Sequence, residues 1–405
     1  MERVVITGMG AITPVGNDVP SFWESLKTGK CGIGPITKFD VSNFKVKLGA
    51  EVKDFDPTQY MEKREARRAD ANVHYAMAAA IQAVEQAGLK EGNFDPYRTG
   101  VIFGSGVGGL HVAEQEVPKL LEKGPGRVSP FAIPEMIANI AAAYISMHFG
   151  FKGENFCPVS ACATGNHSIG EAMRAIRHGY QDVMVAGGAE ELCPSEVAVF
   201  DTLFAASTRN DEPELTPRPF DANRDGLVIG EGACTLVLEE LEHARARGAR
   251  IHAELVGFAT NCDATHITQP NSKTMRICME EALRTAGLAP SDIGYLSAHG
   301  TATSRGDCAE SNATASLFGN RTPVSSLKSF FGHTLGACGS IEAWLAIEMM
   351  REGWFSPTIN LTDIDPECGE LDYITGKERR IDTEFVQSNN FAFGGINTSL
   401  IFKRM

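Results

Sequence analysis

Several sequence features are scarce or missing in this chain of 405 residues, and each absence argues against a particular class of protein. No apolar run approaches the ~20 residues that a membrane-spanning helix needs. The chain has 37 Lys and Arg against 51 Asp and Glu, which gives a net charge of −14. This charge argues against non-specific binding to nucleic acid or to an anionic membrane surface, because such binding needs a positively charged protein surface. The first residues lack the basic region and apolar stretch of a signal peptide, so we expect a cytoplasmic protein.

Paired cysteine motifs are also missing. The ten cysteines are dispersed, and no two of them form a C-x-x-C pair. This spacing disfavours a zinc ribbon and a thioredoxin-type redox site. Dispersed cysteines are mostly small buried hydrophobic residues, which leaves the question of whether one of them is chemically different.

Short apolar segments alternate with amphipathic ones, a pattern typical of an α/β protein. Residues 3–8 are predicted to form a buried strand. Apolar residues recur at helical spacing over 73–87, and Gly88 follows where a C-cap glycine belongs. Residues 100–106 and 182–188 each predict a strand that runs into a glycine turn.

Two pairs of short segments match in the same order along the chain: AVEQAGL at 83–89 with ALRTAGL at 282–288, and EAMRAI at 171–176 with EAWLAI at 342–347. The second match has an offset of 171, which also pairs Gly165 with Gly336 and Cys162 with His333. Either match alone is explained equally well by chance. Together they favour a duplicated α/β unit with halves at 1–250 and 251–405, packed as one body because no low-complexity linker separates them.

Cys162 differs from the other cysteines in its surroundings. It lies among small residues in SACATG, where a substrate can approach, and an amphipathic helix begins just after it. The positive end of a helix dipole favours a thiolate. We therefore predict that Cys162 is a nucleophile, whereas Cys157, Cys234 and Cys278 lie in apolar runs and are predicted to be structural.

Two of the ten histidines stand apart. His299 lies in SAHGTAT just past a predicted strand, and His333 lies in KSFFGHTLG at the start of the helix expected to mirror the Cys162 helix, five residues after Lys328. Open α/β sheets bind ligands at the carboxyl ends of their strands. Taken singly, either histidine is better explained as structural. Together with Cys162 and Lys328 they predict nucleophilic catalysis with polarised carbonyl chemistry.

The last aromatic and glycine-rich segment, residues 389–402, is predicted to be a glycine-hinged loop followed by a strand. Its loop carries Phe391, Phe393 and Gly394. One interpretation is a turn packed on core phenylalanines. The other is a mobile gate whose backbone N–H groups lie near the thiol.

Taken in order, the motifs SACATG, AHGTAT, KSFFGH and NFAFGGIN resemble those of the elongating β-ketoacyl-acyl carrier protein synthases, most of all the type II enzymes of bacterial fatty acid synthesis. The segments VVITGMGAITPVG, STRNDEP, RPFDANRDGLVIGEGA and DATHITQP extend the resemblance over essentially the whole chain. It implies a thiolase-like α/β fold, in which duplicated βαβ halves form α-β-α-β-α layers, and a homodimer.

The resemblance implies a decarboxylative Claisen condensation. Cys162 would hold an acyl chain as a thioester, with the N–H groups of Cys162 and Phe393 as the oxyanion hole. His299 and His333 would donate hydrogen bonds to the carbonyl of malonyl-acyl carrier protein, and the carbanion left by decarboxylation would attack the acyl thioester. Loss of carbon dioxide drives this two-carbon extension, so no cofactor or metal is expected beyond the phosphopantetheine arm that enters with the carrier protein.

Further roles follow from the same resemblance. Lys328 would orient the site, with Glu310 and Glu342 as supporting carboxylates. Phe393 would be the gate, with Phe391 beside it, and Val107 would lie in the acyl pocket. Docking of the acidic acyl carrier protein is expected on the basic residues of this acidic chain: Lys63, Arg64, Arg67, Arg68 and Arg209. The alternative for this charge run is a solvated helix face.

Some positions depart from the family pattern, among them Ala392, Ile396, Leu227, Cys234, Cys338 and Phe330-Phe331. None removes a catalytic group, but together they leave open a ketosynthase of a type II polyketide or polyene pathway, paired with a chain-length factor as a heterodimer. A chain-length factor itself would lack Cys162. A thiolase would carry a second catalytic cysteine, and a Cys–His hydrolase would not decarboxylate malonyl substrates.

Overall fold

The computed structural model describes all residues from Met1 to Met405. The strands of the amino-terminal half that build the main sheet are β1 (Val4–Ile12), β4 (Thr99–Gly104), β5 (Asn155–Phe156), β6 (Val183–Glu190) and β7 (Gly232–Glu240). Those of the carboxy-terminal half are β8 (Ala253–Cys262), β9 (Ile293–Ser297), β10 (Pro323–Ser325), β12 (Asp372–Tyr373), β14 (Phe385–Ala392) and β15 (Ile396–Arg404). The predicted strands at 3–8, 100–106 and 182–188 are therefore confirmed as β1, β4 and β6.

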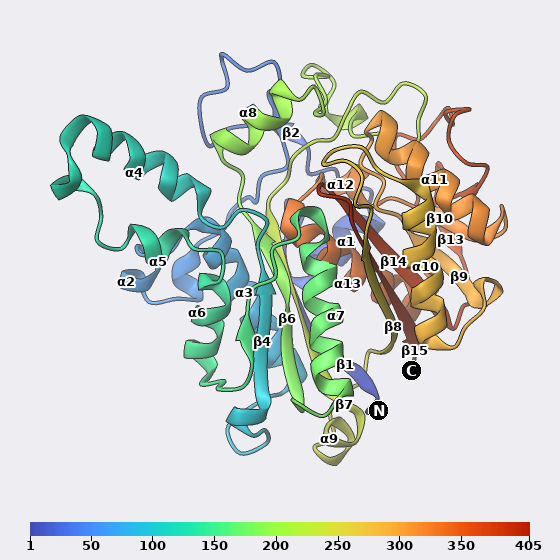
Figure 1. The fold of residues 1–405 in the computed structure, drawn as a ribbon, viewed down its shortest axis with the longest axis horizontal. Coiled ribbons are helices and arrows are strands. Elements are labelled where there is room, and N and C mark those ends of the chain that lie inside the picture. The colour runs from blue at the N-terminus through green and yellow to red at the C-terminus, as the bar shows by residue number, and fades with distance from the viewer.

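These strands form one sheet in which the same order occurs twice. One half has the order β5-β4-β6-β7-β1 and the other the order β10-β9-β14-β15-β8, with β12 added at the outer edge. Within the sheet the two halves are joined where Val5 and Ile6 of β1 pair with Glu254 and Ala253 of β8. The predicted duplicated α/β fold is confirmed (Figure 1).

Helices cover both faces of each half-sheet. The main ones are α3 (Ala71–Ala87), α6 (Ile140–Phe149), α7 (Thr164–Arg177), α10 (Ser272–Ala286), α11 (Ser304–Phe318) and α13 (Cys338–Glu352). Helix α3 packs on β1, β6 and β7, while α7 and α13 pack on each other between the half-sheets and α10 packs on β8 and β15. This gives the predicted α-β-α-β-α layers, with α7 and α13 in the middle (Figure 1).

Alternating side chains explain these layers. In β4, Val101 and Phe103 belong to the same core cluster as α3 and α6, whereas Ile102 belongs to the cluster that contains α7 and α13. Because successive residues of a strand point to opposite faces, a continuous apolar strand needs cover on both sides. The predicted helix at 73–87 is confirmed as α3, which ends at Gly88 in a left-handed conformation with φ +67°.

The two middle helices cross at a pair of glycines. A Cβ on Gly165 would lie 2.5 Å from the backbone nitrogen of Ser340, and one on Gly339 would lie 2.7 Å from that of Asn166. The contacts are reciprocal, as in a pseudo-twofold arrangement, and relate the halves by an offset of 174. Only glycine allows the two backbones to approach this closely.

The predicted offset of 171 is therefore wrong by three residues. Ala161 and Leu335, both with positive φ (48° and 44°), also obey the offset of 174 and lie in corresponding turns before α7 and α13. Cys162 thus corresponds to Gly336, not to His333. A shift of three residues is nearly one helical turn, so it keeps the apolar faces in phase and makes the wrong alignment look correct.

The remaining helices include α1 (Val19–Lys27), α2 (Lys63–Ala66), α4 (Leu110–Lys123), α5 (Ala132–Met136), α8 (Pro194–Thr202), α9 (Leu241–Ala246) and α12 (Lys328–Phe331). Helices α4 and α5 form an arm that projects from the body (Figure 1). None of the residues of α4 is buried. No helix in the structure combines the length and the apolar character required to cross a bilayer.

Candidate active site

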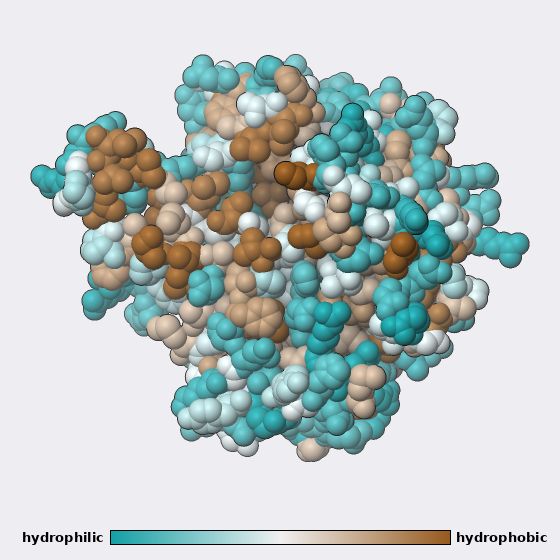
Figure 2. All heavy atoms as spheres, viewed as in Figure 1, coloured by the Kyte–Doolittle hydropathy of each residue, from teal (hydrophilic) through white to brown (hydrophobic).

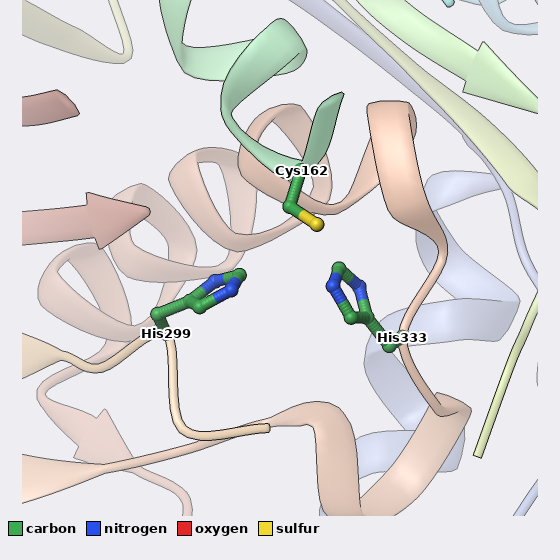
Figure 3. Close-up of side chains that lie close together, drawn as sticks. All are labelled: Cys162, His299 and His333. Atoms are coloured by element: carbon green, nitrogen blue, oxygen red, sulfur yellow. The ribbon is translucent and has the colours of Figure 1, made fainter. Parts of the chain in front are cut away.

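A cavity of about 440 Å³ brings the predicted catalytic residues together. Cys162, His299 and His333 line it, as do Phe391 and Phe393. The sulfur of Cys162 and ring nitrogens of both histidines lie within 4.8 Å of one another. Figure 3 shows the sulfur turned toward the gap between the two imidazoles, which come from separate segments of the chain. The ring centroids are 5.2 Å apart and the rings are nearly perpendicular, at 86°.

Cys162 lies in a single 3-10 turn, Ala161–Ala163, immediately before α7. The left-handed residue Ala161 reverses the chain at this point, and only 8% of Cys162 is exposed. Burial raises the pKa of the Cys162 thiol to about 11, although Lys328 and the N–H groups of Phe393 and Cys162 act to lower it. The expected thiolate is thus not the resting form, because desolvation outweighs Lys328 and the two N–H groups.

His299 follows β9, and hydrogen bonds from its backbone and that of Gly300 fix its position. The Glu310 carboxylate on α11 accepts hydrogen bonds of 2.7 Å from the N–H groups of both His299 and Gly300. Nζ of Lys328 lies 3.2 Å from His299 Nδ1 and can only donate, so Nδ1 accepts and the ring proton is on Nε2. Burial, Lys328 and His333 hold the pKa of His299 well below its ordinary value, so the ring is neutral.

His333 lies between α12 and α13 rather than directly at a strand end. Its N–H donates to the Val228 carbonyl at 2.7 Å, and its carbonyl accepts from the Gly230 N–H at 2.9 Å. The Leu335 N–H donates to His333 Nδ1 at 3.2 Å, which again leaves the proton on Nε2. Burial and Lys328 lower the pKa of His333 well below its ordinary value. The site therefore holds two neutral imidazoles with Nε2–H donors.

Lys328 and Glu342 form a fully buried ion pair beside these histidines. Burial alone would lower the pKa of Lys328, but Glu342, with Cys338 and Glu310, outweighs it and keeps that pKa raised. Lys328 also donates to the His299 carbonyl at 2.7 Å. The lysine thus contacts the site through His299, and the orienting role that the resemblance implies for it stays a prediction.

The predicted loop with Phe391 and Phe393 is a tight hairpin turn. Strand β14 continues to Ala392, so only Phe393–Gly395 form the turn, and Asn389 to Ala392 are strand rather than loop. A Cβ on Gly395, which has φ +71°, would lie 2.6 Å from the Asp263 Cβ, so this position requires glycine. Phe393 is 38% exposed and stacks on Phe200 with ring centroids 5.9 Å apart.

Val107 is not part of this cavity. It is 46% exposed at the surface of the single chain, near the start of α4. The chain alone therefore does not enclose the residue that was predicted to line the acyl pocket.

The predicted docking residues fall into two groups. Lys63, Arg64 and Arg67 are exposed on and beside α2, and Arg68 lies over the ring of Phe131, 4.1 Å from its centroid. Arg209 is held by Asp225, which lines the cavity, and donates to the Asn223 carbonyl at 3.0 Å. A second basic cluster, Lys119, Lys123 and Arg127, lies on the arm and was missed from sequence because its residues are spread over nine positions.

Two more residues of the site were missed. The amide nitrogen of Asn390 contacts His299, Glu342 and Cys338. Neither Asn390, which opens the motif NFAFGGIN, nor Cys338 was assigned a role from the sequence, because these partners are far away along the chain. The set His299, Cys338 and Glu342 has the spacing of a metal site. A metal ion there would face the ammonium of Lys328, which already neutralises Glu342.

Comparison with known proteins agrees with this geometry. The Beta-ketoacyl synthase N-terminal domain matches residues 1–244, and the Beta-ketoacyl synthase C-terminal domain matches residues 252–362. The chain belongs to the β-ketoacyl synthase family. The family assignment made from the motifs is thereby confirmed, as are the expectation of an enzyme and that of a thiolase-like fold.

Relatives match over the full length of this β-ketoacyl synthase. The 3-oxoacyl-acyl-carrier-protein synthases 2 of Synechocystis sp. and Vibrio cholerae are each 46% identical and cover 100% of this chain and 98% and 99% of their own. A β-ketoacyl synthase crystal structure from Burkholderia phymatum is 49% identical, with TM-score 0.96 and complete coverage of both chains. The ishigamide ketosynthase/chain length factor is 34% identical, with TM-score 0.93 over 100% of this chain and 99% of that one.

Proposed function

We propose that this enzyme condenses malonyl-acyl carrier protein with an acyl chain held on Cys162 and extends it by two carbons, as in fatty acid elongation. One observation carries the proposal. Two neutral imidazoles, each with its proton on Nε2, face a buried thiol that is also approached by the N–H groups of Cys162 and Phe393. This arrangement provides two separate sites for negative charge around one nucleophile.

In the first half-reaction the Cys162 sulfur attacks the acyl thioester. A bond forms between Sγ and the carbonyl carbon, the bond to the phosphopantetheine sulfur breaks, and the thiol proton leaves with that sulfur. The N–H groups of Cys162 and Phe393 stabilise the oxyanion of the tetrahedral intermediate. Because the pKa of Cys162 is about 11, deprotonation has to accompany attack.

In the second half-reaction the two histidines act on the malonyl thioester. Their Nε2–H groups donate to its carbonyl oxygen, the bond to the carboxylate carbon breaks, carbon dioxide leaves, and the electron pair becomes an enolate. The enolate carbon then attacks the acyl-Cys162 carbonyl, and the bond from that carbonyl carbon to Sγ breaks. The departing thiolate takes up a proton from solvent, which restores the thiol. Each neutral ring can fill this role because its Nδ1 accepts a hydrogen bond and its one proton lies on Nε2. The sequence of steps needs no cofactor.

The protein is proposed to act as a homodimer. Strand β5 is an unpaired edge of the main sheet, and Phe156 and Val159 are exposed beside it. Figure 2 shows apolar side chains gathered over the α4–α5 arm and on toward β4. The exposed apolar residues of the segment that contains α4 and α5 include Leu121, Ile133 and Ile137. A partner on this face would cover the apolar surface and enclose Val107, completing an acyl pocket.

The partner in the reaction is proposed to be an acyl carrier protein, which a solved type II polyketide ketosynthase (31% identical) binds in its own complex. The exposed basic residues of α2 and of the arm offer two cationic clusters on an otherwise acidic chain. A type II polyketide or polyene pathway is the second candidate. Leu227 in the cavity wall favours it as a departure from the elongating family pattern. The ishigamide ketosynthase/chain length factor shares the fold at 34% identity, below the 46% of the 3-oxoacyl-acyl-carrier-protein synthases 2.

Intact mass after incubation with a panel of acyl-carrier proteins tests the proposal. Wild type is expected to gain acyl mass from saturated chains, and Cys162→Ala is not. Loading from unsaturated or polyketide-like chains alone would support the second candidate. Equal labelling of both proteins would refute the role of Cys162.

A further inference from the structure

Asn390 is a buried polar residue that the chemistry above does not use. It lies in β14 opposite Thr398 of β15 and is fully buried. Its amide nitrogen lies 2.8 Å from Glu342 Oε2 and 3.0 Å from His299 Nδ1, with Cys338 Sγ farther away at 3.6 Å. The side chain thus connects the buried ion pair to an imidazole that faces Cys162.

The contact with Glu342 determines which end of the amide faces the site. A carboxylate only accepts hydrogen bonds, so the group 2.8 Å from it is the amide NH2 and not the carbonyl. The opposite orientation would bring two oxygens into contact in a buried place. One N–H is therefore directed at Glu342, and the second is available to His299.

His299 Nδ1 consequently faces two groups that only donate. Nζ of Lys328 lies at 3.2 Å and Nδ2 of Asn390 at 3.0 Å. A neutral imidazole carries one ring proton, and on Nδ1 that proton would oppose both donors. Lys328 has three N–H bonds and also donates to Glu342 and to the His299 carbonyl. Of the two contacts to Nδ1 of the ring, the one from Asn390 is the shorter.

We propose that Asn390 is a positioning residue that holds His299 in the Nε2–H tautomer and so presents a donor to the carbonyl of the bound malonyl thioester. The substrate in this statement rests on the proposed function, but the tautomer is a property of the resting protein. Without Asn390, only the longer contact from Lys328, which also donates to Glu342 and to the His299 carbonyl, disfavours a proton on Nδ1, and part of the population is expected to carry it there. The lone pair of Nε2 then faces the enolate oxygen and opposes its formation.

Two substitutions at Asn390 distinguish an effect on the His299 tautomer from an effect on packing. Asn390→Leu keeps the volume and removes both N–H groups, and Asn390→Asp places an acceptor where His299 now meets a donor. We expect decarboxylation of malonyl-acyl carrier protein to fall about 10- to 100-fold in Asn390→Leu, the scale on which outer hydrogen-bond partners of a functional imidazole act, and further in Asn390→Asp. Acyl loading of Cys162 does not use the His299 donor and is expected to persist.

The matched control is Asn389→Leu. Asn389 is the adjacent buried asparagine of β14, but its carbonyl accepts from Ser399 at 2.7 Å and its amide does not contact His299. It is expected to change stability without selectively slowing decarboxylation. A loss of both half-reactions in Asn390→Leu, equal to that in Asn389→Leu, would reduce Asn390 to a structural role and overturn the proposal.

Long-range 15N–1H correlation spectra of protein labelled at histidine test the tautomer directly, without substrate. Wild-type His299 is expected as Nε2–H, with Nδ1–H appearing in Asn390→Leu, or in Asn390→Ser if the leucine variant does not fold. Nδ1–H in wild type, or unchanged spectra in the variant, would refute the proposal. If wild type shows Nε2–H but does not decarboxylate malonyl-acyl carrier protein, the proposed function fails while the assignment to Asn390 holds.

Discussion

The thiol of Cys162 keeps its proton in the resting protein, and this gives its chemistry a definite pH dependence. With a pKa of about 11, the thiolate fraction increases tenfold for each pH unit well below that value. Alkylation of Cys162 by iodoacetamide, followed by peptide mass spectrometry, is therefore predicted to accelerate about tenfold per unit between pH 7 and pH 9. A rate that levels off near pH 7 would show that the helix terminus and Lys328 prevail over burial.

The buried pair of Lys328 and Glu342 predicts strong coupling between two single residues. Removing one partner leaves the other charge buried without compensation, at a cost of about 3–5 kcal/mol. Glu342→Gln and Lys328→Met are each expected to lower the free energy of unfolding by that order. Chemical denaturation should show that the double variant loses less than the sum. Additive losses would mean that the pair is not coupled.

At the scale of elements, the crossing of α7 and α13 fixes the position of Cys162. Gly165→Ala would place a Cβ 2.5 Å from the backbone of Ser340 and force the helices apart. We expect a loss of about 1–3 kcal/mol in the free energy of unfolding, typical of overpacking, together with slower acyl loading. The control is Gly126→Ala, where a Cβ meets nothing within 4 Å. Equal stability of the two variants would contradict the tight crossing.

The elements also show what the sequence could and could not predict. The strands, α3 and the motifs around Cys162, His299 and His333 were predictable because local periodicity and glycine positions specify them. The raised pKa of Cys162 was not, since its burial comes from chain segments far apart in sequence. The repeat offset was misplaced because helical phase is preserved by a three-residue shift, and Asn390 carries no local signal of its partners.

At the scale of the whole molecule, the apolar arm and the free edge of β5 predict a dimer of twice 43.6 kDa. Ile133→Asp and Phe156→Lys place charges on this face and are expected to give monomers in light scattering coupled to size exclusion. Ile364→Asp, at an exposed apolar residue outside it, serves as the control. A monomeric wild type, or dimers of unchanged stability in both variants, would place the interface elsewhere.

The most direct test of the account is to load Cys162 with a saturated acyl chain, remove the donor, and add malonyl-acyl carrier protein. Mass spectrometry of both proteins follows the two half-reactions. We expect the acyl mass to leave Cys162 and to reappear on the carrier protein as a 3-oxoacyl chain two carbons longer. Retention of the acyl group on Cys162, or its release as a free acid without a lengthened product, would contradict it.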